Sequence, residues 1–267
     1  MMNPEIEIRE VPLMWENRRV YGQLYTPKDP AGPLPAVILC HGYGGDARGL
    51  EGDARYFAGE GFAAYAFDFS GGGLGSRSDG SPSEMSVLTE AAQLSAVMYA
   101  VRALPGIDPD NLFLWGASQG GFVASLAASE HPSDVRALVC LFPAYVIQDD
   151  TRRRVPDPEH IPEKMDVMGM TLGAVYHRDA LSFDVYEKIS RYPRPVLILH
   201  GEADTLVPIA YSERAIEAFP DARLIPVPGA GHGFGGADWL LASSSAARFF
   251  KANLRTADSE ENKGGRA

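Results

Sequence analysis

Short runs of apolar residues recur along the chain, and stretches with the periodicity of a helix separate them. Runs of this length bounded by turn residues predict buried strands, here at residues 36–40, 62–68, 112–115, 137–142, 195–199 and 222–227. Apolar residues repeated on one helical face predict helices at about 48–60, 83–104 and 122–129. Because strands alternate with helices, we expect an α/β fold whose mostly parallel sheet is covered by helices on both faces.

The alternation is less regular at the beginning and in the middle of the chain. Residues 6–14 and 19–25 predict two further strands, which we expect to pair as a hairpin. Residues 143–190 hold several prolines and a basic run, and we interpret them as a small inserted cap over the sheet; the alternative is an irregular surface excursion. The core then comprises residues 1–142 and 191–255. The polar tail, residues 256–267, is expected to be disordered.

Composition narrows the classes of protein that fit this pattern. The 267 residues are 45% hydrophobic and 22% charged, which is typical of a globular protein. A net charge of −11 argues against nucleic-acid partners, which need basic patches. No apolar run reaches the length of a membrane span, and residues 1–11 lack the apolar stretch of a signal peptide. We therefore expect a cytoplasmic protein without a membrane partner; a homodimer stays open.

The sequence GASQG at residues 116–120 is the most informative motif. It follows the apolar run 112–115 and precedes the helical run 122–129, and this order is the nucleophile elbow of α/β-hydrolases. The central serine, Ser118, would sit on a sharp turn, and glycines on either side would let the strand and the helix approach closely. A helix N-terminus below the serine would offer free N–H groups to a developing oxyanion.

Two further residues complete a catalytic triad in the chain order that this fold requires, serine, acid, histidine. Asp204 follows the strand predicted at 195–199, and His232 follows the strand predicted at 222–227. His232 would take the proton of the Ser118 hydroxyl, and Asp204 would fix the imidazole tautomer. Glu202 is a rival acid, but Asp204 lies deeper in its loop.

An oxyanion hole is predicted from the loop after the strand at 36–40, which reads HGYGG at residues 41–45. In this fold one donor is the backbone N–H of the residue after the nucleophile, here Gln119, and the other comes from this loop, here Tyr43. The alternative is a flexible turn between strand and helix.

The remaining chemistry-bearing residues are expected to be structural. No cluster shows the spacing of metal ligands, so no metal is expected, and the triad needs no cofactor. Cys40 and Cys140 end strands that another strand separates, so we expect two reduced core thiols. Asp68 is expected to make structural hydrogen bonds. The basic run 152–154 is typical of a solvated face, and binding of a carboxylate-bearing substrate is the alternative.

Taken together, the motifs resemble those of bacterial cinnamoyl/feruloyl esterases. The resemblance covers about residues 20–250 and includes the inserted segment, at 143–150, 172–176 and 185–187. It implies that the cap residues Asp150 and Tyr176 bind the hydroxyl groups of a phenolic ring. The chain departs from the family at Ala117, where a histidine is frequent, and at residues 151–154, where a Gly/Asn/Gln-containing stretch is usual.

The expected function is that of a serine carboxylic-ester hydrolase that forms an acyl-serine. Its small-molecule substrate would be a hydroxycinnamate ester or another small aryl or short-acyl ester. A general carboxylesterase, a thioesterase, a peptidase and a perhydrolase use the same triad and stay open as alternatives. A non-catalytic binding protein that kept the fold is a further alternative, although all three triad residues are present.

Overall fold

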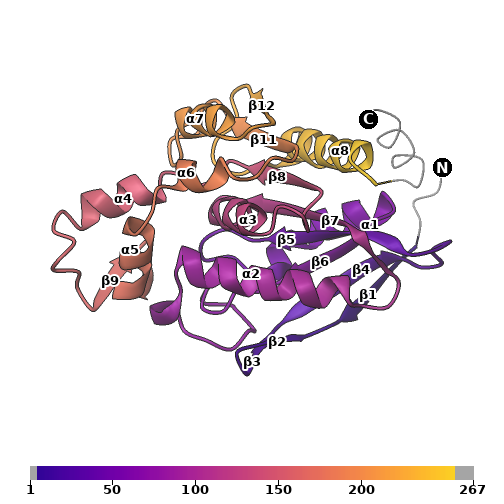
Figure 1. The fold of residues 1–267 in the computed structure, drawn as a ribbon, viewed down its shortest axis with the longest axis horizontal. Helices are drawn as coiled ribbons and strands as arrows, with labels where there is room; N and C mark the ends of the chain where they lie inside the picture. Colours follow the sequence, from indigo (N-terminus) through magenta and orange to yellow (C-terminus); the bar gives the residue numbers. More distant parts are fainter. Residues whose placement is uncertain (1–4, 256–267) are drawn as a thin grey trace, which may run out of the picture.

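A twisted eight-stranded sheet forms the centre of the protein in the computed structural model, which describes residues 5–255 (Figure 1). The strands lie in the order β1-β4-β6-β5-β7-β8-β11-β12; β1 and β4 are antiparallel to their neighbours, and from β6 onward all pairs are parallel. Their bounds are β1 Ile6–Glu10, β4 Gly22–Pro27, β5 Leu34–Cys40, β6 Ala63–Phe67, β7 Ile107–Ala117, β8 Ala137–Leu141, β11 Val196–Gly201 and β12 Ala222–Val227.

Helices cover both faces of this sheet. On one face α2 and α3 pack together over the central strands, with α6 and α7 beside them, and on the other face α1 packs against α8 (Figure 1). The two faces carry separate apolar clusters, as the continuous burial of the parallel strands requires. The bounds are η1 Ala47–Leu50, α1 Glu51–Gly59, η2 Pro82–Glu84, α2 Val87–Arg102, α3 Gln119–Glu130, α7 Ala210–Ala218 and α8 Gly236–Ala252.

Residues 142–195, which we call the β8–β11 segment, interrupt the alternation of strand and helix. They form α4 (Ile147–Arg154), the antiparallel pair β9 (Lys164–Val167) and β10 (Met170–Gly173), α5 (Ala174–Leu181) and α6 (Val185–Ile189). In Figure 1, α4, β9 and α5 extend away from the sheet on one side.

The predicted pairing of the two N-terminal runs as a hairpin is confirmed, because both parts of the first run pair antiparallel with the second run in one register. The first run divides in two, and its first part, β1, pairs with β4 at the edge of the main sheet. The tip of this hairpin, β2 (Leu13–Trp15) and β3 (Arg18–Val20), forms a two-stranded sheet of its own around Glu16 and Asn17, both at positive φ. Positive φ at two consecutive residues is the mark of a tight hairpin turn, and asparagine tolerates it well.

Two expectations about buried side chains are confirmed, those for the two cysteines and for Asp68. Strand β7 lies between β5 and β8, and Gly116 stands opposite both Cys40 and Cys140, so the two buried thiols stay free. Asp68 is fully buried and accepts hydrogen bonds from the Ala47 backbone and the Arg77 guanidinium. Within residues 5–255, no helix is long and apolar enough to cross a bilayer. The tail, residues 256–267, lies outside the described residues.

Candidate active site

Ser118 stands at the turn between β7 and α3. Its backbone has φ 55° and ψ −123°, a strained conformation for a residue with a side chain. The flanking glycines explain how the turn is packed: a Cβ at Gly116 would lie 2.3 Å from the carbonyl oxygen of Gly120, and a Cβ at Gly120 would lie 2.2 Å from that of Cys40. Strand, helix and the neighbouring strand therefore meet at van der Waals distance, as the motif predicts.

The structure brings Ser118, His232 and Asp204 together from the ends of three strands. His232 Nε2 lies 3.0 Å from Ser118 Oγ, and His232 Nδ1 lies 2.8 Å from Asp204 Oδ2. Because a carboxylate only accepts, Nδ1 carries the proton and Nε2 is left to accept from the serine hydroxyl. The Phe142 ring packs edge-on against the imidazole, with 4.8 Å between ring centroids, and this contact limits its rotation.

Asp204 is held from the side opposite His232. Its Oδ1 accepts hydrogen bonds from the backbone N–H groups of Leu206 and Val207, each at 2.9 Å. The buried His200 ring lies below it, with Nε2 2.8 Å from the Val207 carbonyl oxygen and 3.3 Å from Asp204 Oδ2. Burial lowers the pKa of His200, so the ring is neutral, its Nε2–H faces two acceptors, and Nδ1 accepts from the Ser212 hydroxyl.

The loop after β5 and the start of α3 flank the nucleophile, and each carries a backbone N–H without a protein acceptor among the described residues. A Cβ at Gly42 would lie only 3.1 Å from Ser118 Cβ, so the loop after β5 passes directly over the serine. Within residues 5–255, the backbone N–H groups of Tyr43 and Gln119 donate to no protein acceptor. The Tyr43 hydroxyl donates to the Val167 carbonyl oxygen at 2.5 Å, which ties this loop to β9.

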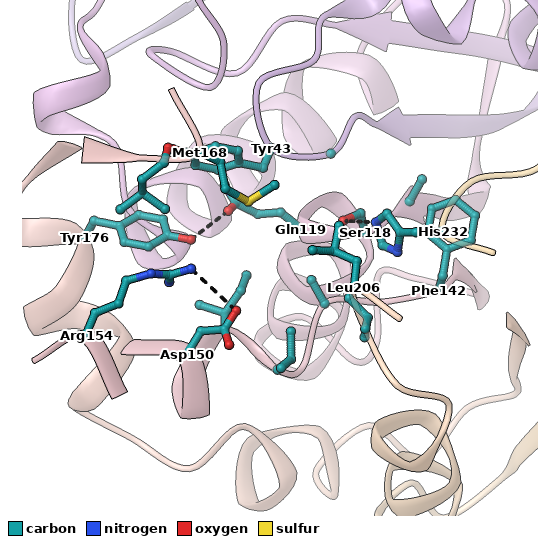
Figure 2. A pocket seen from close by; sticks show the side chains of 17 residues that line it. Tyr43, Ser118, Gln119, Phe142, Asp150, Arg154, Met168, Tyr176, Leu206 and His232 are labelled. Atoms are coloured by element: carbon teal, nitrogen blue, oxygen red, sulfur yellow. Dashed lines mark hydrogen bonds and ion pairs between the residues drawn. The ribbon is translucent and has the colours of Figure 1, made fainter. Parts of the chain in front are cut away.

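A cavity of about 400 Å³ opens beside Ser118, between the loop after β5 and the β8–β11 segment (Figure 2). This volume falls in the range of small-molecule sites, roughly 300–1,000 Å³. Most of the side chains that line it are apolar, and Met168, Leu206 and Arg154 are exposed. Among the described residues, the carboxylate and guanidinium groups in the lining are those of Asp150 and Arg154.

Asp150 and Tyr176, named from the family resemblance, both line this cavity, but each already has protein partners (Figure 2). The Tyr176 hydroxyl donates to Gln119 Oε1 at 3.1 Å. The Asp150 carboxylate forms ion pairs with Arg153 and Arg154 on its own helix. A phenolic substrate would therefore share these groups with the protein.

Glu90 is a residue near the site that the sequence pattern did not single out. It lies on α2, is 3% exposed, and accepts a hydrogen bond from Gln119 Nε2 at 2.8 Å. Burial raises the pKa of Glu90 to about 8. Glu90, Gln119 and Tyr176 thus form one buried chain of hydrogen bonds, which fixes the Gln119 side chain behind its backbone N–H.

Comparison with known proteins gives the family. A family model described as "Serine aminopeptidase, S33" matches residues 31–179, more than half of the chain, and one described as "TAP-like protein" matches residues 182–255. The chain belongs to this family of α/β-hydrolases. The hydrolase fold and the family predicted from the sequence motifs are thereby confirmed.

This hydrolase is similar to several known proteins. It superposes on Est1E from Butyrivibrio proteoclasticus, solved with ferulic acid bound, with a TM-score of 0.82 and 25% identity over 91% of this chain and 98% of that chain. It is 28% identical over 232 residues to an uncharacterised protein of Mycobacterium tuberculosis, covering 84% of this chain and 72% of the relative. It is also 28% identical to the alpha/beta hydrolase domain-containing protein 17C of Homo sapiens, over 63% of this chain and 43% of the relative.

Proposed function

We propose that this hydrolase is a serine carboxylic-ester hydrolase with Ser118 as nucleophile, His232 as base and Asp204 as the orienting acid. The observation that carries the proposal is the hydrogen-bonded row from Asp204 through His232 to Ser118, at 2.8 and 3.0 Å, at the wall of an apolar cavity. The strained elbow and the two free backbone N–H groups support it, because acyl transfer needs a nucleophile and an oxyanion site side by side.

The proposed reaction has two steps. Ser118 Oγ attacks the ester carbonyl carbon while His232 Nε2 takes the hydroxyl proton, and the backbone N–H groups of Tyr43 and Gln119 donate to the oxyanion. His232 then protonates the leaving alcohol as its C–O bond breaks, which leaves an acyl-serine. Water attacks the acyl-serine carbonyl and passes a proton to Nε2, and the proton returns to Ser118 Oγ as the acid leaves.

The proposed substrates are esters with a small aryl or short acyl group, hydroxycinnamates included. The apolar walls fit such groups, and the similar Est1E was solved with ferulic acid bound. A cap aspartate and tyrosine that accept a ring hydroxyl would have to be Asp150 and Tyr176. If they act so, Asp150→Asn and Tyr176→Phe each lower kcat/KM for methyl ferulate more than for an aliphatic ester of equal size; equal losses would leave a general carboxylesterase.

The description of the matched family makes an aminopeptidase the second candidate. A free α-ammonium group needs a carboxylate beside it, and among the described residues only Asp150 supplies one in the cavity lining. That carboxylate is already paired with Arg153 and Arg154. We therefore favour esters, and faster turnover of an aminoacyl p-nitroanilide than of p-nitrophenyl acetate would reverse this preference.

The decisive experiment is Ser118→Ala, with the exposed Ser133→Ala as the matched control. We expect the first variant to fold, to lose hydrolysis of p-nitrophenyl acetate and to resist labelling by a fluorophosphonate. The second should keep both properties, because Ser133 lies outside the cavity lining. Hydrolysis that survives in Ser118→Ala would reject the serine mechanism.

A further inference from the structure

The three arginines at the end of α4 do not share one environment. The side chains of Arg152 and Arg153 are 55% and 63% exposed, whereas that of Arg154 is 33% exposed and lines the cavity. In Figure 2 the Arg154 guanidinium lies between Tyr176 and Asp150 and points toward the interior of the cavity. The structure thus separates one arginine from a run that the sequence presents as uniform.

Arg154 is weakly paired within the protein. Its Nη2 lies 3.7 Å from Asp150 Oδ2, which is beyond hydrogen-bond distance, while Arg153 donates a close hydrogen bond to the other oxygen of the same carboxylate. The described residues offer the Arg154 guanidinium no acceptor within hydrogen-bond distance. A planar group with five N–H donors is therefore left with unused donors in the cavity wall.

The charged side chains of α4 pair with one another at this end of the cavity. The guanidinium groups of Arg153 and Arg154 face the single carboxylate of Asp150, and the neighbouring Asp149 is paired with Arg152 and accepts from the Tyr211 hydroxyl. Asp166 on β9 and Arg154 both act on the Tyr43 hydroxyl, and burial and Arg154 lower the pKa of the neighbouring His177. Each carboxylate of α4 is thus engaged by a neighbouring arginine, and Arg154 is the guanidinium that faces the cavity.

We propose that Arg154 determines substrate specificity by binding a carboxylate at the far end of the acyl group of the ester. The proposal rests on the proposed esterase function of Ser118. Two N–H groups of a guanidinium match the two oxygens of a carboxylate, and such charge-assisted pairs are stronger than a single neutral hydrogen bond.

Direct binding tests the subsite without turnover. In the Ser118→Ala background, calorimetry compares methyl 4-carboxycinnamate with methyl cinnamate, which differ only in the para group. We expect the carboxylate to bind about ten- to a hundredfold more tightly, the range given by hydrogen bonds to charged groups. Arg154→Met should abolish this ratio, whereas Arg152→Met, on the same helix and outside the cavity lining, should preserve it. Equal affinities, or a ratio that survives Arg154→Met, would overturn the proposal.

A second variant, Asp150→Asn, is expected to raise the affinity for a carboxylate-bearing ester rather than lower it. Asp150→Asn removes the carboxylate that competes for the two arginines, so it should raise the affinity for methyl 4-carboxycinnamate and lower the affinity for methyl 4-hydroxycinnamate. A fall in affinity for both ligands would contradict a positive subsite. Hydrolysis of the same esters by the intact enzyme tests the proposed function separately. Carboxylate binding without any ester hydrolysis would reject the esterase and retain the subsite. Ester hydrolysis with no preference for the carboxylate-bearing ester would retain the esterase and reject the subsite.

Discussion

Replacing Glu90 by glutamine is expected to change how the stability of the protein depends on pH. The carboxyl of Glu90 is buried, and its pKa is about 8 in the folded protein against an ordinary value of 4.5. Between these two values the folded state holds a proton that the unfolded state releases, so the free energy of unfolding falls as the pH rises. Glutamine keeps the acceptor for Gln119 Nε2 and removes the titration.

The magnitude follows from the two pKa values. One proton of difference changes the free energy of unfolding by about 1.4 kcal/mol per pH unit, and the slope flattens close to the folded pKa. Over the interval from pH 6 to pH 8, Glu90→Gln should therefore gain about 2 kcal/mol of stability relative to the wild type. Urea unfolding followed by tryptophan fluorescence at pH 6, 7 and 8 and constant salt measures this difference.

Asp53 provides the matched control, because it is a buried carboxyl that titrates in a lower range. Burial raises the pKa of Asp53 to about 6, and its carboxylate accepts hydrogen bonds from Trp239 Nε1 and the Ser243 hydroxyl. Between pH 7 and pH 8, the free energy of unfolding of Asp53→Asn should differ from that of the wild type by a constant amount. This difference should change only below about pH 6. A constant stability difference between Glu90→Gln and the wild type across pH 6–8 would refute the reasoning.

The elbow and the triad give two more predictions. Gly120→Ala places a methyl group 2.2 Å from the Cys40 carbonyl oxygen and should lower the free energy of unfolding in urea by about 1–3 kcal/mol. In the control Gly59→Ala nothing lies within 4 Å of the added atom, so the protein should not be destabilised. Equal effects of the two changes would mean that the elbow is not tightly packed. Asp204→Asn should leave the fold intact and lower kcat for p-nitrophenyl acetate about 10⁴-fold, as in comparable triads, because an amide does not stabilise protonated His232; an unchanged kcat would remove Asp204 from the mechanism.

Several features were readable from local pattern alone. The apolar runs predicted the strands of the main sheet, and the glycines of the elbow predicted a close crossing of strand and helix that the structure contains. The order of Ser118, Asp204 and His232, each after a strand, placed all three at one edge of a parallel sheet. Such inferences succeed because burial imposes a period on the sequence and because a strained turn admits few residue types.

Other features depended on packing between distant segments. Glu90 follows Val87 by three residues and so lies on the buried face of α2, but glutamate is rarely buried. Its carboxylate accepts from Gln119 on α3, a contact between helices that are distant in sequence. The division of the first apolar run between β1 and β2, which lie in different sheets, was likewise not readable from its pattern.

The basic run on α4 shows most clearly which features depend on tertiary structure. The sequence by itself determined that residues 152–154 carry three positive charges beside two carboxylates. Only the tertiary structure decided that Arg154 faces the cavity while its two neighbours face solvent. A helix turns by about 100° per residue, so consecutive side chains point in different directions, and the position of the helix over the sheet selects which of them meets a substrate.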